Sequence, residues 1–181
     1  MPNLIPVVFF ETQHFRVRAW DFADLISLKT GINSPSVAKG FDTNYPYTDL
    51  DAQQYIKKVL QKQDGPSRYF AITQKGDDKV IGGGGIYFKE PFVYSIGLWL
   101  SDNNQGKGYG TEVFRSSIRY SFEVLHAEEI YAYYYNWNIV SKRMCFHHHF
   151  SVMTEASSSE EKTCVKLDKI TYQQYLNDYI S

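Results

Sequence analysis

The sequence predicts one compact domain of mixed α/β class, built around a single twisted sheet. Its length of 181 residues suits one hydrophobic core. Hydrophobic residues make up 43% and charged residues 22%, which is too apolar for a disordered chain. Helix and strand periodicities follow the order β-α-α-β-β-β-α-β-α-β-β-α. Because no repeat or change in composition marks a boundary, residues 1–181 are expected to form a single domain.

The individual elements follow from apolar spacing and turn residues. In the first half we expect strands at 4–10 and 14–20, a short helix capped by Asp21, a helix at 49–63, and an antiparallel meander at 67–74, 79–88 and 93–100. In the second half we expect a helix from Lys107 to Leu125, a strand at 129–136, a helix at 138–150, two short strands around a solvated loop at 155–162, and a helix at 171–180. We predict a central sheet of about seven strands.

Two segments carry special expectations. Residues 30–48 are rich in Gly, Pro, Asn and Ser and predict a long loop, in which Phe41, Tyr45 and Tyr47 either line a pocket or pack the loop itself. The helix that follows is expected to bury Leu50, Tyr55, Val59 and Leu60. The four glycines at 82–85 lie inside a strand pattern, which indicates a bulge or a close approach by another backbone or a ligand.

The net charge and the cysteine content limit the binding partners and the cellular compartment that can be expected for this protein. The formal net charge is -1 with no block of like charges, so no nucleic-acid partner is expected. Cys145 and Cys164 are the two cysteines, which predicts neither a disulfide framework nor a cysteine-based zinc site and favours a reducing, cytoplasmic location. The run "LIPVVFF" is too short for a signal peptide, and no apolar stretch is long enough to span a bilayer, so no membrane partner is expected.

The stretch "SDNNQGKGYGTEVF", residues 101–114, indicates an anion-binding loop. A dinucleotide fingerprint from Gly106 or Gly108 would need glycine at Thr111 or Val113, and a Walker A loop would need Ser or Thr after Lys107. Neither motif is present. What remains is a glycine-rich strand-to-helix junction, where free amides at the helix start favour a pyrophosphate or similar group. A glycine-rich turn without a ligand is the alternative at this point.

Several motifs together resemble the GNAT N-acetyltransferase superfamily, in its RimJ/RimL-like branch. "QGKGYG" is similar to the Q/R-x-x-G-x-G/A acetyl-CoA loop, and "IGLWLSDNNQGKGYGTEV" resembles the longer block around it. "ETQHFRVRAW", "YPYTDLDAQQYI", "VIGGGGI" and "NWNIVSKRMCFHHHF" resemble further family segments in the same order. The resemblance implies the GNAT fold, with a V-shaped split between the fourth and fifth strands, here "SIGLWL" and "EIYAYYYN".

The resemblance also implies how acetyl-CoA, the donor substrate, is bound. The pantetheine arm would pair with strand backbone at Leu98, Trp99 and Leu100. The pyrophosphate would be held by the loop residues Gln105, Gly106, Lys107, Gly108, Tyr109, Gly110 and Thr111. Asn138 would bond the pantetheine, and Ser141 would lie near the sulfur, where protonation of the leaving thiolate is a hypothesis. No metal is implied.

The proton path is where this chain departs from its relatives. Many carry Glu before the Ile-Gly of the strand, and this chain has Ser95, so a carboxylate base at that position is absent. Glu112 is the remaining catalytic candidate beside Ser141, with a first-turn helix charge as its structural alternative, and Glu90 is a weaker one. Position 145, where another branch has a Tyr acid, is Cys145, read as a core thiol.

The run of three histidines, His147, His148 and His149, does not predict a metal site, because adjacent helical residues point about 100° apart. His149 replaces the glycine that relatives use before the next strand, so the helix is expected to end differently here.

We therefore expect an enzyme that transfers an acetyl group from acetyl-CoA to a primary amine, a small molecule or a protein N-terminus, by direct attack in a ternary complex. The alternative is a non-catalytic acyl-CoA-binding module that lost its base, which Ser95 favours. A nucleotide-phosphate protein built on the same loop is a third reading.

Overall fold

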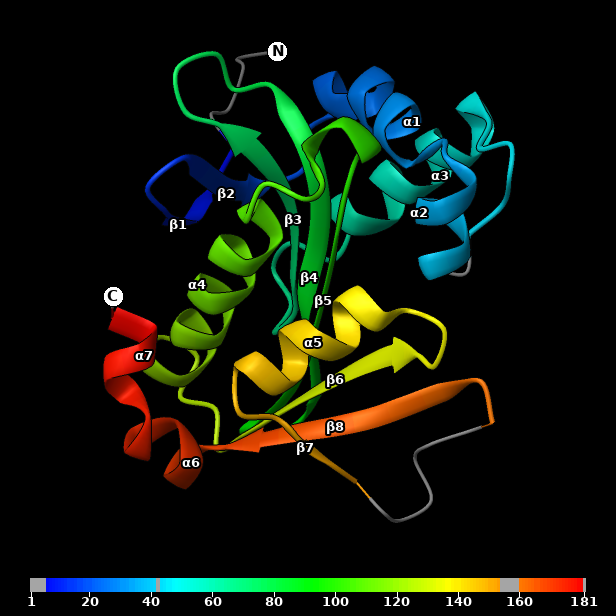
Figure 1. The fold of residues 1–181 in the computed structure, drawn as a ribbon. Coiled ribbons are helices and arrows are strands. Elements are labelled where there is room, and N and C mark those ends of the chain that lie inside the picture. The colour runs from blue at the N-terminus through cyan, green and yellow to red at the C-terminus, as the bar shows by residue number, and fades with distance from the viewer. Residues whose placement is uncertain (1–5, 42, 154–159, 181) are drawn as a thin grey trace. The chain divides into compact units, whose positions relative to one another are not determined.

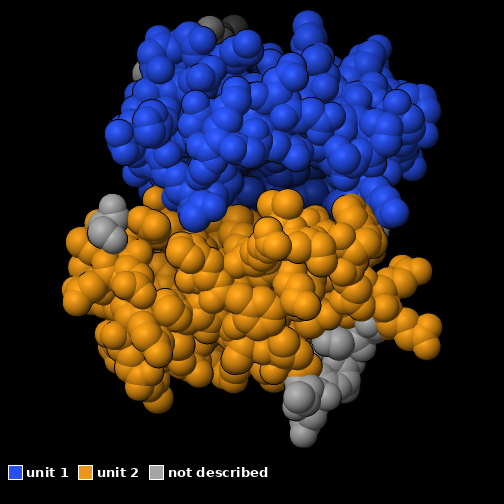
Figure 2. All heavy atoms as spheres, in the orientation of Figure 1, with its two compact units in different colours: residues 1–85, 98–113 blue, residues 86–97, 114–181 orange. Residues whose placement is uncertain are grey.

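The computed structural model of the chain describes residues 6–41, 43–153 and 160–180. It divides into two compact units, residues 1–85 with 98–113 and residues 86–97 with 114–181, which Figure 2 colours separately. One eight-stranded sheet has the order β1-β2-β3-β4-β5-β6-β8-β7. This confirms the mixed α/β class; the strand count is eight because the N-terminal segment contributes β1.

The first unit begins with an antiparallel ladder. The strands are β1 (Val8–Glu11), β2 (Phe15–Ala19) and β3 (Arg68–Gln74), and β2 pairs with both of the others. Along β2, Phe15 and Val17 are buried, as expected of the alternating pattern at 14–20. The sheet continues into β4 (Val80–Glu90) and β5 (Val93–Leu100), so the meander predicted at 67–100 is present in chain order.

Three helices, α1, α2 and α3, lie together in the first unit (Figure 1). Asp21 caps the 3-10 turn Phe22–Asp24, and α1 follows at Leu25–Ile32. α3 spans Asp49–Leu60 behind a capping box of Thr48 and Asp51. These helices bury Leu28, Ile32, Ala52, Ile56 and Val59 against Trp20, Ala71 and Trp99, which form the unit's main apolar cluster.

The prediction that residues 30–48 form one long loop is wrong, because a helix lies within this segment. Residues Pro35–Gly40 form α2, because the Ser34 side chain accepts from the amide of Val37 and Pro35 occupies the first turn. Tyr47 is buried in the core, Phe41 packs against it, and Tyr45 is 58% exposed. The helical face of α3 also differs in one place: Leu50 is 62% exposed, and Ala52 and Ile56 take the buried positions.

A buried ion pair braces the start of this unit. The Arg18 guanidinium donates two hydrogen bonds to the Asp24 carboxylate, at 2.8 and 2.9 Å, and another to Asp78 at 2.9 Å. Such fork-shaped pairs are among the stronger hydrogen bonds in proteins. Arg18 therefore ties β2 to the first helical turn and to the β3–β4 turn.

The second unit carries the far half of the sheet. β5 pairs in parallel with β6 (Glu129–Tyr135) over Val93–Ile96 and Glu129–Ala132, and both strands continue beyond the last pair. β6 is antiparallel to β8 (Lys162–Asp168), which pairs with β7 (Ser151–Val152). The two strands predicted to diverge are thus β5 and β6. The solvated loop expected at 155–162 falls mostly outside the described residues.

The helices of this unit differ from expectation at their ends, and the last of them is divided in two. α4 runs from Tyr109 to Glu123 and enters the unit at Phe114, which is buried with Ile118 and Phe122. α5 spans Ile139–His147. The helix expected at 171–180 is two helices, α6 (Lys169–Gln174) and α7 (Leu176–Ile180), with Tyr175 at the C-cap of the first. Among the described residues, no helix combines the length and apolar character required to cross a bilayer.

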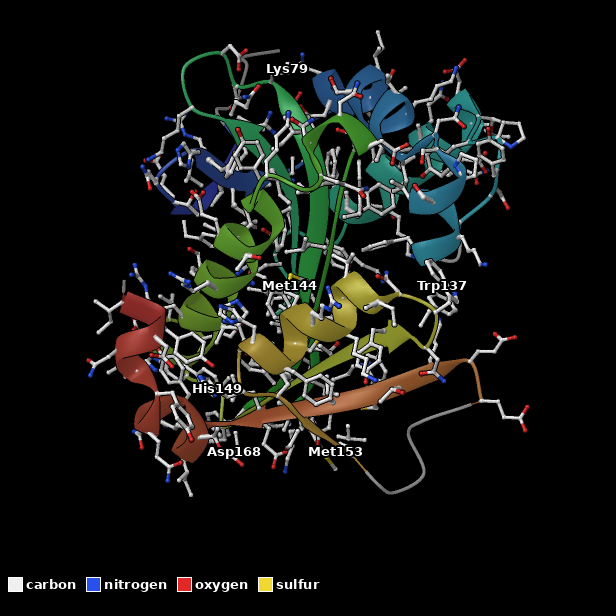
Figure 3. All side chains as sticks on the ribbon, in the orientation of Figure 1. Lys79, Trp137, Met144, His149, Met153 and Asp168 are labelled. Carbon is white, nitrogen blue, oxygen red and sulfur yellow. The ribbon has the colours of Figure 1, made fainter. Side chains whose placement is uncertain are left out.

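The prediction that α5 ends differently from a helix followed by glycine is wrong, because α5 ends in the way that glycine normally allows. His149 adopts φ +63°. Its amide donates to Phe146 O, and the Phe150 amide donates to Cys145 O, both at 3.1 Å. This is the Schellman pattern with histidine in the left-handed position. His149 tolerates it because its ring stacks on Tyr175 at 3.8 Å and bonds Asp178 at 2.9 Å. Figure 3 labels His149 where α5 gives way to the next strand.

Candidate functional site

The glycine loop predicted to hold an anion joins β5 to α4 in the first unit. After a 3-10 turn at Asp102–Asn104, Gly106 and Gly108 adopt φ of +73° and +81°, the left-handed region that glycine occupies without strain. Apart from the glycine itself and its two chain neighbours, no heavy atom of the described residues lies within 4 Å of the place where a Cβ would stand at either position. Main chain is therefore presented to open space on this side of the loop.

α4 begins directly behind these glycines. The carbonyl of Gly108 accepts the first helical hydrogen bond, from the amide of Glu112 at 3.1 Å. The amides of Tyr109, Gly110 and Thr111 consequently precede the first residue that has a partner one turn back. Three donors and the positive end of the helix dipole thus follow the two exposed glycines. The residues present fit a pyrophosphate or a similar anion.

Side chains tie the loop back to β5. The Gln105 Nε2 group donates to the carbonyl of Leu100 at 2.8 Å, so its role in the structure is to close the loop. The Asn104 amide group donates to Ser101 Oγ at 2.8 Å, and Ser101 donates to the carbonyl of Ile81 on β4 at 3.1 Å. The loop is fixed at its N-terminal end before it reaches the glycines.

The strand residues predicted to pair with pantetheine lie at the end of β5. Trp99 and Leu100 are 6% and 7% exposed, so their side chains belong to the core and only main chain is available to a ligand. Leu98 precedes them on the same strand. A Cβ on Gly82 would stand 2.2 Å from Trp99 O, which shows why β4 carries glycine there. At Gly83 the same test meets the Trp20 ring at 2.4 Å, so both glycines serve close packing as anticipated for 82–85.

Glu112 is engaged by residues that the sequence did not single out. The amide of His14 donates to its Oε1 at 2.9 Å, and His14 Nδ1 bonds its Oε2 at 2.8 Å. Burial would raise the pKa of Glu112, but hydrogen bonds from Thr12 and His14 outweigh it and hold that pKa below its usual range. His14 lies 98 residues away along the chain, and no local spacing could have predicted this contact.

The other predicted site residues lie in the second unit, at the start of α5. Asn138 is the N-cap, and its Oδ1 accepts from the amide of Ser141 at 3.0 Å. Its Nδ2 group is left for other partners, and Ser141, in the first turn, is partly buried. On β5, Ser95 is 4% exposed and stands in register with Tyr131. It offers neither a carboxylate nor an open position.

The surroundings of the remaining candidate residues, Cys145, Glu90 and the three histidines, give them no catalytic or metal-binding arrangement within the part of the chain that the structure describes. Burial raises the pKa of the Cys145 thiol to about 12, so it stays protonated in the core. Glu90 is exposed at the end of β4. His147 is exposed, His148 is buried at the C-cap of α5, and His149 follows it in the left-handed conformation. Across residues 6–41, 43–153 and 160–180, no group of three or more His, Cys, Asp or Glu side chains is placed to hold a metal ion.

Comparisons with known proteins match this arrangement. A family model described as an acetyltransferase (GNAT) domain matches residues 14–151. An N-acetyltransferase of Bacillus subtilis strain 168, YnaD, itself called uncharacterized, is 26% identical over 136 residues, which cover 74% of this chain and 76% of that protein.

Solved structures share the fold. RimL, the ribosomal L7/L12 alpha-N-protein acetyltransferase, in complex with coenzyme A, superposes with a TM-score of 0.76 at 14% identity, covering 91% of this chain and 99% of that one. Spermidine N-acetyltransferase from Vibrio cholerae, in complex with CoA and spermine, gives a TM-score of 0.74 at 15% identity, covering 88% and 98%.

Proposed function

The chain belongs to the GNAT acetyltransferase family, and from that premise we propose that it transfers an acetyl group from acetyl-CoA to a primary amine. The observation that carries the proposal is the loop at 105–111, where two left-handed glycines and the open amides of α4 stand behind β5. Acetyl-CoA supplies the activated acyl group, and the chain supplies its position. The sequence motifs favour the RimJ/RimL-like branch.

Each predicted residue receives a role on this reading. The amides of Gly106, Gly108 and the first turn of α4 hold the pyrophosphate, and the Lys107 ammonium adds charge. Because Gln105 occupies the Leu100 carbonyl, Leu98 and Trp99 provide the main chain for pantetheine. The Nδ2 group of Asn138 donates to the same arm, since its Oδ1 is committed to Ser141.

The chemical step is a direct displacement in a ternary complex. The amine loses a proton to water or a base, its lone pair attacks the thioester carbon, and a main-chain amide of β5 stabilises the negative oxygen. The C–S bond then breaks, and the thiolate takes up a proton, for which the Ser141 hydroxyl is the proposed donor. The acylated nitrogen releases its second proton, which restores the Ser141 hydroxyl and leaves a neutral amide. With Ser95 buried and uncharged, the proton leaves the amine along a path that contains no carboxylate at that position.

The acceptor is proposed only as a class. The names of the compared structures point to a polyamine in one case and a ribosomal-protein N-terminus in the other. Both are primary amines, and an antibiotic or an amino-acid-like amine belongs to the same class. A panel of spermidine, an aminoglycoside and alanine- or serine-initiated peptides therefore covers the proposal.

Calorimetry followed by thiol release tests the proposal. Wild-type protein is titrated with acetyl-CoA, with CoA and with ATP, and CoA release is then followed across the amine panel. Gly108→Ala, which forces a side chain into φ +81°, is expected to weaken acetyl-CoA binding, whereas Gly40→Ala, in open space on α2, leaves it unchanged.

The outcomes separate the readings. Binding of acetyl-CoA with turnover of any amine supports the enzyme. Binding without turnover across the panel supports the non-catalytic acyl-CoA module that the loss of a carboxylate at Ser95 favours. Displacement by ATP but not by CoA supports a nucleotide-phosphate protein, and no binding of either ligand overturns the assignment of the loop.

A further inference from the structure

The first turn of α4 is held by the turn between β1 and β2, within the same unit. Both oxygens of Glu112 are bonded to His14, one to its main-chain amide at 2.9 Å and one to its ring at 2.8 Å. The Phe15 amide in turn donates to Thr12 Oγ1 at 2.9 Å, which closes the turn that presents His14. A carboxylate with hydrogen bonds to two donors of one residue is fixed in direction as well as in place.

Aromatic contacts extend this attachment to the loop itself. The Tyr109 ring meets Phe15 edge to face, with centroids 4.8 Å apart, and lies 6.1 Å from the His14 ring. The Lys107 ammonium stands 6.0 Å from the centre of the Tyr109 ring. A chain of contacts thus runs from the β1–β2 turn through Tyr109 to a charged residue between the two left-handed glycines.

The same contacts make Glu112 a poor general base. Its two oxygens face His14 rather than open space, and its pKa is held below the usual range for glutamate. A base that takes a proton from an amine near neutral pH needs a raised pKa and a free oxygen. Glu112 has neither, although its position in the glycine block made it a catalytic candidate.

We propose that Glu112 is a positioning residue, which with His14 anchors the first turn of α4 on the β1–β2 turn and so fixes the amides that receive the donor's pyrophosphate. The inference rests on the proposed function, because it assumes that the loop at 105–111 binds the pyrophosphate of acetyl-CoA. It assigns the β1–β2 turn, residues 12–15, to the donor site as a supporting element.

Two acetyl donors of different length test the proposal. Glu112→Gln keeps the shape of the side chain but replaces one acceptor by a donor, and His14→Ala removes the ring bond while keeping the main-chain amide. Both variants are expected to raise the KM and Kd for acetyl-CoA roughly tenfold, the effect of losing one charge-assisted bond, with the loss in KM rather than in kcat. With S-acetylpantetheine, which has no pyrophosphate, kcat/KM should match the wild type.

The control is Glu11→Gln. Glu11 is an exposed carboxylate on β1 that pairs with Arg16 at 2.9 Å and has no part in the contacts to α4. Thermal midpoints of all variants are measured beside the kinetics. Hydrogen exchange of the apo proteins gives a readout that needs no donor: amides at 105–111 should exchange faster in the Glu112 and His14 variants than in wild type and control.

Three results would overturn the proposal, and the third is the one that also overturns the proposed function. A fall in kcat with both donors assigns Glu112 to proton transfer, and unchanged acetyl-CoA kinetics with unchanged exchange removes it from the site. If exchange rises as expected but the wild type binds no acetyl-CoA, the anchoring of α4 stands as structure while the donor site, and with it the proposed function, falls.

Discussion

His148 is a buried histidine whose surroundings disfavour its charged form. It is 2% exposed, with the rings of Phe114 and Tyr179 at 5.5 and 5.8 Å. Burial, helped by the nearby side chains of His147, Arg115 and His149 and opposed by Asp178, lowers the pKa of His148 to about 4. Its Nε2 atom has no hydrogen-bond partner among the described residues.

Acid should therefore destabilise the protein through this one residue. An unfolded chain protonates His148 near pH 6.5, whereas the native protein resists until about pH 4. The native state consequently loses stability as the pH falls between these values, by at most about 3 kcal/mol. Urea denaturation at pH 7 and pH 4.5 measures the loss.

A matched pair of variants separates this effect from general acid denaturation. His148→Phe, which cannot titrate, should show a smaller loss of stability between the two pH values, whatever its stability at pH 7. His126→Asn, at an exposed position that does not contribute to the shifted pKa of His148, should keep the wild-type pH dependence. Equal pH dependence in all three proteins would show that His148 is not the group responsible.

Residue roles were predictable where they depend on local sequence and not where they depend on distant partners. Asp21 as a cap and the glycines at 106 and 108 follow from neighbouring residues alone. His149 was expected to change the end of α5, but Tyr175 and Asp178, far along the chain, let it occupy glycine's conformation. The contact between His14 and Glu112 is of the same kind.

Among the elements, the strands, the long helices and the short helix after Asp21 matched their patterns, whereas α2 and the division between α6 and α7 did not. α2 was missed because the glycines, serines and prolines of 30–48 suggested a loop, although Ser34 followed by Pro35 is a helix start that could have been recognised. α6 and α7 were merged because their apolar spacing continues across Tyr175. In α3, the buried stripe consists of Ala52, Ile56 and Val59 at spacings of four and three, and Leu50 lies outside it on the solvent side.

Two strand glycines should respond to substitution in opposite ways. Gly82→Ala would place a Cβ 2.2 Å from Trp99 O, so β4 and β5 could pair only after a backbone shift, and we expect a loss of several kcal/mol or no folded protein. Gly97→Ala, on β5, meets no atom within 4 Å and should be neutral or slightly stabilising. Thermal melts and soluble yield compare the two.

The comparison is informative because both changes add one methyl group to a strand. Equal tolerance of both alanines would mean that β4 does not approach Trp99 as closely as the structure has it. Equal damage would mean that the space beside Gly97 is filled. A damaging Gly82→Ala beside a tolerated Gly97→Ala supports the local geometry and gives a stable variant in which donor binding can be measured.

For the molecule as a whole, the chain itself links the two compact units. The boundaries fall inside continuous elements: within β4 after residue 85, within β5 after residue 97 and within α4 after residue 113. Each unit is made of two separate stretches of sequence. A change in amino-acid composition along the chain would therefore not be expected to mark the boundary between the units. The predicted site residues are divided likewise, Leu98 to Glu112 in the first unit and Asn138 with Ser141 in the second.

The prediction of a single domain over residues 1–181 can therefore be tested by the number of unfolding transitions. Because three hydrogen-bonded elements run through both units, unfolding of one must disrupt elements of the other, and we expect one cooperative transition. Trp20 and Trp99 lie in the first unit and Trp137 in the second. Trp137 is exposed, so it can be replaced by Phe. Tryptophan fluorescence of the Trp137→Phe variant then reports on the first unit alone.

Hydrogen exchange of β6 and β8 in rising urea reports on the second unit in the same variant. Both probes are expected to show the same urea midpoint. Acetyl-CoA at a hundredfold excess over Kd should raise the free energy of unfolding reported by both probes by about 2.7 kcal/mol. Separate midpoints would divide the chain into two folding domains. A rise confined to the first unit would show that the donor is held by the loop at 105–111 without Asn138 and Ser141, because a ligand stabilises only the parts that must be folded to bind it.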